Sequence, residues 1–254
     1  MFAKKVIKHD LTVQEIILNP DEIKKVKSLV NNGNIVIFKN FETIETCKEI
    51  IKYVHGIILN NLEVMTPIEN KCNNYVRFSQ SDSRAVVPIY CNSVSFFQWN
   101  RDLYEFFNRY GDCFRLKNLI AGANSERYLN KSVEEDDCTS RIACHFYPEG
   151  KGYLGAHTDP LGKHQVITST LILNIGQSHG FYVLKDNNEK WYIENELEVG
   201  DFYIASPLLT HGVDIVGSED DFNPLSINGR WCLLFPVNKV ATNTLIADSV
   251  MIDI

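Results

Sequence analysis

The sequence lacks the features that mark several specialised classes of protein. Its 7 cysteines in 254 residues are an odd number and include no Cys-x-x-Cys pair, which argues against a disulfide framework and a cysteine-based zinc site. No apolar run approaches the ~18 residues that a membrane-spanning helix needs. The segment from Met1 to Asp10 has lysines but no apolar stretch after them, unlike a signal peptide. We therefore expect reduced thiols, a cytoplasmic location and no membrane association.

An excess of positive charge is also missing. The chain has 25 Lys and Arg against 32 Asp and Glu, a net charge of −7, so it has no general basic surface for nucleic acid. Hydrophobic residues make up 44% of the chain and charged residues 22%, as in ordinary globular proteins. This length suits one domain with an extensive core. We expect a single domain over residues 1–254 and a small-molecule partner rather than nucleic acid.

The spacing of apolar residues changes near residue 140. Residues 1–139 predict helices with one entry strand, and the polar segment Ser125 to Thr139 predicts either a lid or a plain solvated connection. Residues 140–240 predict short strands separated by turns such as Pro148-Glu149-Gly150, and residues 241–254 form a tail. The expected helices are 21–30, 43–54 and 97–119, and the expected strands are 35–38, 141–147, 165–174, 180–184, 190–193, 201–205 and 231–237. This pattern favours a mainly β sandwich or barrel with flanking helices.

The segment Gly155-Ala156-His157-Thr158-Asp159-Pro160 carries the most informative pattern. Residues two apart on an extended strand face the same side, so His157 and Asp159 can direct an imidazole nitrogen and a carboxylate at one point. His211 is the best candidate for a third ligand. It lies 54 residues after His157, and this length is enough for about four strands with their turns, which can bring the chain back beside itself. Two histidines and one carboxylate leave coordination positions open, which suits non-haem Fe(II) oxygen chemistry. A structural zinc site fills its positions with protein ligands instead.

An arginine and a tyrosine extend this pattern. Arg230 lies 19 residues after His211 inside an apolar strand, where burial of an arginine is favourable only if it meets an anion. Its planar fork fits a carboxylate. Tyr147 precedes the His-x-Asp segment, and its hydroxyl can face the same pocket. A structural salt bridge is the simpler interpretation of Arg230, and packing is the simpler interpretation of Tyr147.

Three further side chains are candidates for contacts with a substrate. His145 lies two residues before Tyr147 and faces the same way on a strand. Arg77 and Arg141 can each bind a substrate carboxylate. The simpler interpretation of His145 is a core or supporting histidine, and that of the two arginines is surface charge.

In order and spacing, these segments resemble the Fe(II)- and 2-oxoglutarate-dependent dioxygenases, especially their phytanoyl-hydroxylase-like and prolyl-hydroxylase-like branches. The matching segments are Tyr147 with Gly150, His157-Thr158-Asp159, Thr170 to Asn174, Gly180 to Val183, Glu198 to Asp201, His211-Gly212-Val213 and Arg230. One departure is that Gly217 to Asn228 reads as an inserted acidic loop. It places Arg230 further from the second histidine than in many members.

The resemblance implies a double-stranded β-helix, a cupin-like jelly roll, with N-terminal helices. It implies Fe(II) held by His157, Asp159 and His211, with O₂ and 2-oxoglutarate as the other reactants. The far carboxylate of 2-oxoglutarate is expected on Arg230.

The same resemblance implies further cosubstrate contacts from Tyr147 and Thr170. The expected reaction is hydroxylation of an unactivated C–H bond of a small molecule, an amino acid or a natural-product intermediate, with release of succinate and CO₂. Asp159 favours hydroxylation over halogenation, because related halogenases have Gly or Ala at this position. Desaturation and ring formation stay open.

Two other classes of function also stay open. One is a jelly-roll module that binds a metal or a small ligand without turnover. The other is a zinc hydrolase with the same three ligands, although no glutamate stands near them as a general base. Metal content and activity with Fe(II) against Zn(II) distinguish these classes.

Overall fold

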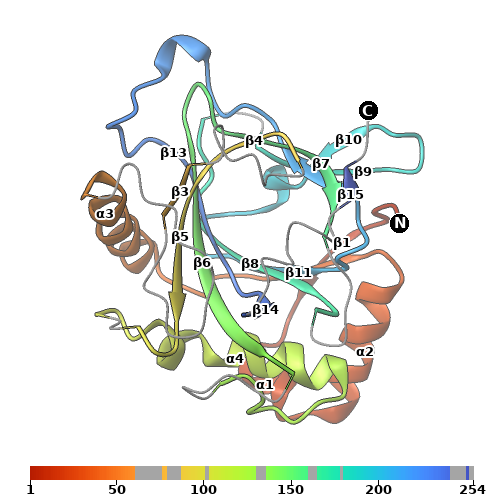
Figure 1. Cartoon of the computed structure of the whole chain (residues 1–254). Coiled ribbons are helices and arrows are strands. Elements are labelled where there is room, and N and C mark those ends of the chain that lie inside the picture. Colours follow the sequence, from red (N-terminus) through yellow and green to blue (C-terminus); the bar gives the residue numbers. More distant parts are fainter. Residues whose placement is uncertain are drawn as a thin grey trace.

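The structure is a computed structural model. It describes residues 1–60, 76–78, 87–100, 103–129, 136–159, 165–177, 180–240 and 250–251, and at 76–78, 239 and 250–251 it describes the backbone only. Two β-sheets curl toward each other, and helices cover the outer side of the larger one (Figure 1). This is the jelly roll with N-terminal helices that the sequence predicts.

The larger sheet runs in the order β1-β2-β11-β8-β13-β6-β5-β3, with β14 paired to β6. Its strands are β1 (Val6–His9), β2 (Ile35–Phe38), β3 (Val76–Phe78), β5 (Asn92–Phe97), β6 (Cys138–Pro148), β8 (Thr168–Asn174), β11 (Phe202–Ala205), β13 (Gly229–Leu234) and β14 (Val237–Lys239). The neighbours β1 and β2 are parallel, whereas β8, β13 and β6 pair antiparallel. Strands that are distant in sequence therefore lie side by side at the centre of the sheet.

The smaller sheet runs β10-β9-β12-β7-β15, with β4 paired to β7. Its strands are β4 (Ile89–Tyr90), β7 (Tyr153–Thr158), β9 (Phe181–Leu184), β10 (Lys190–Tyr192), β12 (His211–Val213) and β15 (Val250–Met251). Two 3₁₀ helices, η2 (Ile193–Glu196) and η3 (Glu219–Asp221), lie in the connections.

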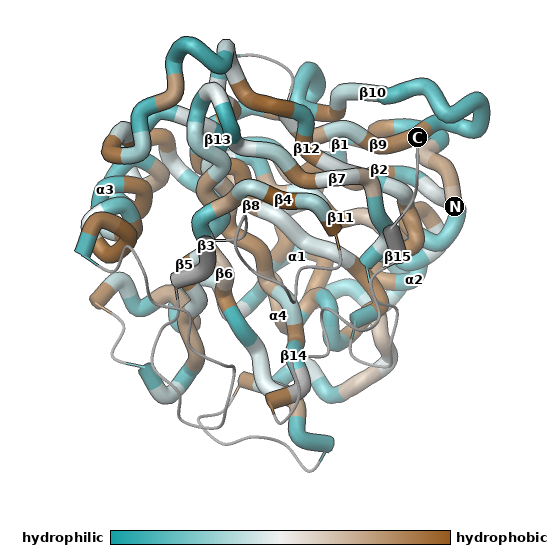
Figure 2. The backbone as a smooth tube through the Cα atoms, turned by 45° about the horizontal axis from the view of Figure 1, so that its top comes forward, coloured by the Kyte–Doolittle hydropathy of each residue, from teal (hydrophilic) through white to brown (hydrophobic). Residues whose placement is uncertain are grey.

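The helices are α1 (Val13–Ile17), α2 (Pro20–Asn31), α3 (Ile44–Asn60) and α4 (Phe106–Ala121). A capping box starts α1, in which the Thr12 hydroxyl accepts from the Glu15 backbone and the Glu15 side chain accepts from the Thr12 backbone. Asn19 caps α2 and Pro20 occupies its first turn, where a missing N–H is harmless. Hydrophobic and hydrophilic residues both occur along α3 (Figure 2), and its apolar side, which includes Ile50 and Val54, is buried. No helix in the described ranges is long and apolar enough to cross a bilayer.

Alternation along β6 separates two cores. Phe146 and Ile142 belong to the cluster that packs under the helices, and the Phe146 ring stacks on Trp231 of β13 with centroids 4.0 Å apart. Tyr147 belongs to the second cluster, between the sheets. The face of β6 that carries Tyr147 is therefore the face that builds the interior of the barrel.

One detail of the sequence expectation was wrong. Residues 97–119 do not form one helix, because Phe97 ends the buried strand β5 and the helix α4 begins only at Phe106. His211 lies past the strand β11, at the start of a further strand, β12. Part of the segment predicted as a lid or connection, residues 130–135, lies outside the described residues.

Candidate active site

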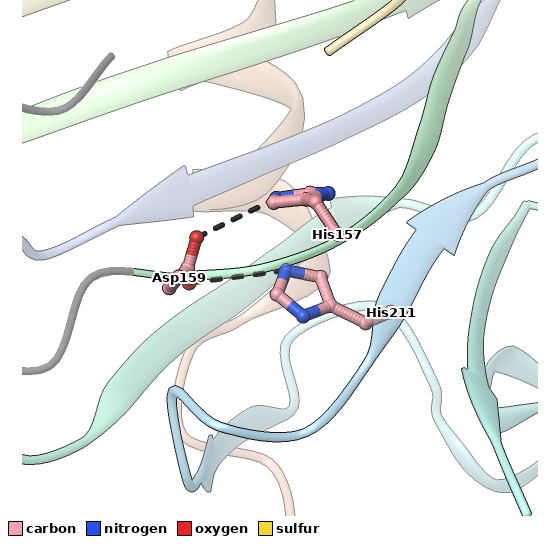
Figure 3. A group of neighbouring side chains, drawn as sticks. All are labelled: His157, Asp159 and His211. Carbon is pink, nitrogen blue, oxygen red and sulfur yellow. Dashed lines mark ion pairs between the residues drawn. The ribbon is translucent and has the colours of Figure 1, made fainter. Parts of the chain in front are cut away.

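Neighbouring strands of the smaller sheet bring the three predicted metal ligands together. His157 lies in β7, Asp159 follows the last residue of that strand, and His211 begins β12. The two strands pair antiparallel with His211 directly opposite His157. In Figure 3 the carboxylate of Asp159 faces both rings. The strand pairing thus turns a separation of 54 residues in sequence into a direct contact.

The distances between the donor atoms suit a single metal ion. One ligand atom from each side chain lies within 4.8 Å of the others. Nε2 of His157 is 3.5 Å from Oδ1 of Asp159, and Nε2 of His211 is 3.8 Å from Oδ2 of the same carboxylate. Two imidazoles and one carboxylate are the donor set expected for an iron site with open positions.

Backbone carbonyls fix which ring nitrogen of each histidine faces this point. Nδ1 of His157 lies 2.9 Å from the carbonyl oxygen of Gly155, and Nδ1 of His211 lies 2.9 Å from that of Leu209. Because a carbonyl oxygen only accepts, each Nδ1 carries the hydrogen and donates it. In the neutral rings the lone pairs are then on Nε2, directed toward Asp159. The two histidines thus have the arrangement that binding of a single cation would require.

The electrostatics keep the carboxylate ionised. Loss of water contact alone would raise the pKa of Asp159, but the charges of His211, His157 and Lys117 outweigh it and lower that pKa to about 2. Burial lowers the pKa of His211, assisted by the neighbouring His157. For His157 burial also acts downward, but the contact with Asp159 prevails and raises its pKa. The Asp159 carboxylate therefore stays ionised, which favours the binding of a cation.

Lys117 is a member of this environment that the sequence analysis missed. It lies in α4 with 1% of its surface exposed, and its ammonium group donates to Oε1 of Gln165 at 2.9 Å and to the carbonyl of Phe235 at 2.8 Å. Burial lowers its pKa to about 7, against the opposing charge of Asp159. Nothing in the local sequence separates this lysine from a surface lysine, because its burial depends on how α4 packs against the sheet.

One pocket is lined both by two of the candidate metal ligands and by Arg230. Its walls include Asp159 and His211 from the smaller-sheet side, and Arg230, Tyr147 and Thr170 from the larger sheet. Its empty volume, with the open solvent at its mouth, is about 530 Å³. The structure thus places the predicted metal site and the predicted anion site in one interior space.

Arg230 is already paired with a residue of the chain. It lies in β13 opposite Tyr147, and its Nε donates to Oε1 of Glu194 in η2. The Arg230 side chain is 2% exposed and that of Glu194 is 3% exposed. Burial raises the pKa of Glu194 although Arg230 opposes the shift, and Glu194 raises the pKa of Arg230 against the effect of burial. The sequence analysis did not identify Glu194, which is one of several acidic residues around η2.

The other candidates differ in how the structure places them. Thr170, in β8, lines the pocket and lies opposite Tyr203 of the neighbouring strand β11. His145 is half-buried, with Nδ1 3.5 Å from the Tyr147 hydroxyl, which is a weak contact. Arg141 is buried on the same face of β6 as Tyr147 and His145. Only the backbone of Arg77 is described, so its predicted substrate contact lies outside the described side chains.

Comparisons with known proteins agree with this architecture. No protein-family model matches the sequence, and no curated protein matches it. Among solved structures, a prolyl-4-hydroxylase from Pseudomonas putida is 11% identical with a TM-score of 0.50, covering 85% of this chain and 98% of that one. A full-length Neurospora crassa protein in complex with alpha-KG and 5-formyluracil is 10% identical with a TM-score of 0.53, over 92% and 83%. An oxygenase from Shewanella oneidensis, described as putative, is 13% identical with a TM-score of 0.51, over 93% and 89%.

These likenesses establish the fold. The chain has the jelly-roll fold of these three proteins. In that fold the described part of the chain holds one candidate metal site, formed by His157, Asp159 and His211.

Proposed function

We propose that the chain is an Fe(II)- and 2-oxoglutarate-dependent oxygenase that hydroxylates an unactivated C–H bond of a small molecule. The observation that carries the proposal is the site itself. Two histidines with their Nδ1 hydrogens fixed by backbone carbonyls present Nε2 atoms to one carboxylate. The pocket beside them contains a buried arginine.

The residues present fit both groups. His157, Asp159 and His211 would hold the iron, because their donor set leaves positions open for other ligands. Arg230 would hold the far carboxylate of 2-oxoglutarate, with Tyr147 and Thr170 beside it on the pocket wall. When bound, iron and 2-oxoglutarate supply the oxidising power, with O₂ giving succinate, CO₂ and a hydroxyl group on the substrate.

The chain itself contributes positioning and exclusion of water. The Gly155 and Leu209 carbonyls hold the imidazole rings in orientation, which sets the direction of both Nε2 atoms. Phe181, Val183 and Leu209 make much of the pocket wall apolar, and such a wall limits water around a reactive centre. Asp159 supplies a third protein ligand, which supports hydroxylation rather than halogenation.

The substrate we propose is a small polar molecule, such as an amino acid or a natural-product intermediate. Two observations support it: the pocket lies in the interior of the barrel, and the net charge of −7 does not favour nucleic acid. We also propose His145 and Arg141 as contacts for it, since both lie on the face of β6 that carries Tyr147.

A test is to add Fe(II) and then 2-oxoglutarate to the protein without oxygen and to record the visible spectrum. Chelation of 2-oxoglutarate at an open iron site gives a weak charge-transfer band, and O₂ with a substrate then gives succinate. Folded, iron-loaded protein that shows no band would contradict the proposal.

The pairing of Arg230 with Glu194 favours a second candidate, a metal-binding jelly roll without turnover. In that case the arginine is structural and no 2-oxo acid needs it. Iron binding without any binding of 2-oxoglutarate would support this second candidate.

A further inference from the structure

Within the described residues, the guanidinium of Arg230 makes hydrogen bonds through two of its three nitrogens. Nε donates to Glu194, and Nη1 lies 3.1 Å from Sγ of Cys232, which is a weak acceptor. Nη2 makes no hydrogen bond with any residue in the described ranges. Since Arg230 lines the pocket, its terminal edge is the part that a ligand can reach.

Glu194 is built into this position. Its Oε1 accepts from Arg230, its Oε2 is buried, and the backbone N–H of Phe181 also favours the ionised carboxylate. Oε2 lies against Gly180, whose φ of +78° and lack of a Cβ allow the close approach. A side chain at Gly180 would collide with the carboxylate. The glutamate is thus part of the interior rather than a mobile surface group.

The pairing of Arg230 with Glu194 changes the net charge that a ligand in the pocket encounters. The titratable groups beside Arg230 are Tyr147, Tyr203 and Cys232, and burial raises the pKa of each, so they stay neutral. Arg230 and Glu194 together are also neutral. A ligand carboxylate on the terminal edge of Arg230 would share one cation with Glu194, and the two carboxylates would repel each other where water screens them little.

We propose that Glu194 sets the selectivity of the pocket for the far end of a 2-oxo acid. By sharing Arg230 it weakens the hold on a distal carboxylate, so that 2-oxo acids with an uncharged end are accepted as well. This inference rests on the proposed function, because it needs a 2-oxo acid as cosubstrate.

The test measures binding without turnover. Protein loaded with Mn(II) in the absence of oxygen is titrated calorimetrically with 2-oxoglutarate and with 2-oxopentanoate, which has the same chain length and no distal carboxylate. We expect the wild type to prefer 2-oxoglutarate by less than about tenfold. Glu194→Gln keeps the acceptor for Nε but removes the charge, and it should raise that preference roughly tenfold by tightening 2-oxoglutarate alone.

A matched control is Glu196→Gln, which removes the same charge two residues further along η2 and should leave both affinities unchanged. Equal or weaker binding of 2-oxoglutarate by folded Glu194→Gln would overturn the inference while leaving the proposed function intact. If that variant does not fold, the ratio of the wild-type affinities for 2-oxoglutarate and 2-oxopentanoate decides. A preference for 2-oxoglutarate above about tenfold would show that Glu194 does not neutralise Arg230. Failure of both acids to bind the metal-loaded wild type would overturn the proposed function and the inference together.

Discussion

His211 of β12 lies directly opposite His157 of β7 in an antiparallel strand pair. Their ring centroids are 4.3 Å apart, and both rings face Asp159. Because side chains alternate along a strand, a slip of one residue would turn one histidine to the other face of the sheet. The candidate metal site therefore depends on strand register.

Removing either histidine should remove the metal. We expect His157→Ala or His211→Ala to weaken Mn(II) binding by more than about 100-fold, since loss of even an outer partner of a ligand weakens it roughly 10- to 100-fold. Metal content and Mn(II) titration followed by electron paramagnetic resonance measure this. His55→Gln is the control, because His55 contacts the carbonyl of Ser226 instead. Wild-type affinity in either alanine variant would show that the ligand set is wrong.

Gly212, next to His211, is required by close packing. A Cβ there would lie 2.5 Å from the Tyr182 hydroxyl and 2.7 Å from the Leu154 carbonyl. Gly212→Ala should lower the free energy of unfolding by about 1–3 kcal/mol, the usual range for overpacking, and should weaken metal binding by displacing His211. Gly56→Ala in α3 is the contrast, because no atom of the described residues lies within 4 Å of the position that a Cβ would take there. It should stabilise the protein by about 0.5–1 kcal/mol. Urea unfolding of both variants measures the difference, and equal effects would contradict the packing argument.

The buried pair of Arg230 and Glu194 should show strong coupling. Arg230→Met leaves Glu194 buried without its partner, so we expect a loss of about 3–5 kcal/mol in the free energy of unfolding. The double variant Arg230→Met, Glu194→Met should recover most of that loss, because an apolar replacement of a buried pair is often neutral. A double-mutant cycle by urea unfolding measures the coupling. Additive effects of the two substitutions would show that the residues do not interact.

Lys117 should make stability depend on pH. Its pKa in the folded protein is about 7, below its ordinary value of 10.5. Between these values the unfolded chain binds more protons at this residue than the folded chain, so its contribution to stability rises with pH by up to about 1.4 kcal/mol per unit. Lys117→Met should remove that contribution between pH 7 and 8.5. The measurement is the difference in urea unfolding between the two proteins without metal, and parallel pH profiles would contradict it.

The fold class could be predicted from the sequence because local patterns encode it, and a local pattern of the same kind gives the candidate metal ligands. His-x-Asp on one strand needs only the two-residue alternation, and the strands after residue 140 are short apolar runs separated by turn residues. The prediction of a helix over residues 97–119 was wrong because aromatic residues suit a buried strand as well as a helix. Phe97 belongs to the strand β5. The single-domain organisation over residues 1–254 stays a prediction.

Glu194 and Lys117 could not be identified from the sequence for a different reason. Their environment depends on partners in distant elements. Glu194 pairs with Arg230, and Lys117 donates to Gln165 and to the carbonyl of Phe235. A glutamate in a run of acidic residues and a lysine in a helix are both ordinary surface residues by local pattern. Only the packing of the elements shows that they are buried.

The candidate metal ligands and Arg230 come from different sheets. His157 and His211 belong to the smaller sheet and Arg230 to the larger one, so no ladder of backbone hydrogen bonds fixes the span between them. Side chains between the sheets fix it, among them Phe181 and Tyr203, whose ring centroids are 5.5 Å apart. The side chains that fill the barrel thus set the distance between the two histidines and Arg230. In the proposed enzyme, trimming one of these rings would change which chain length of 2-oxo acid spans from iron to arginine.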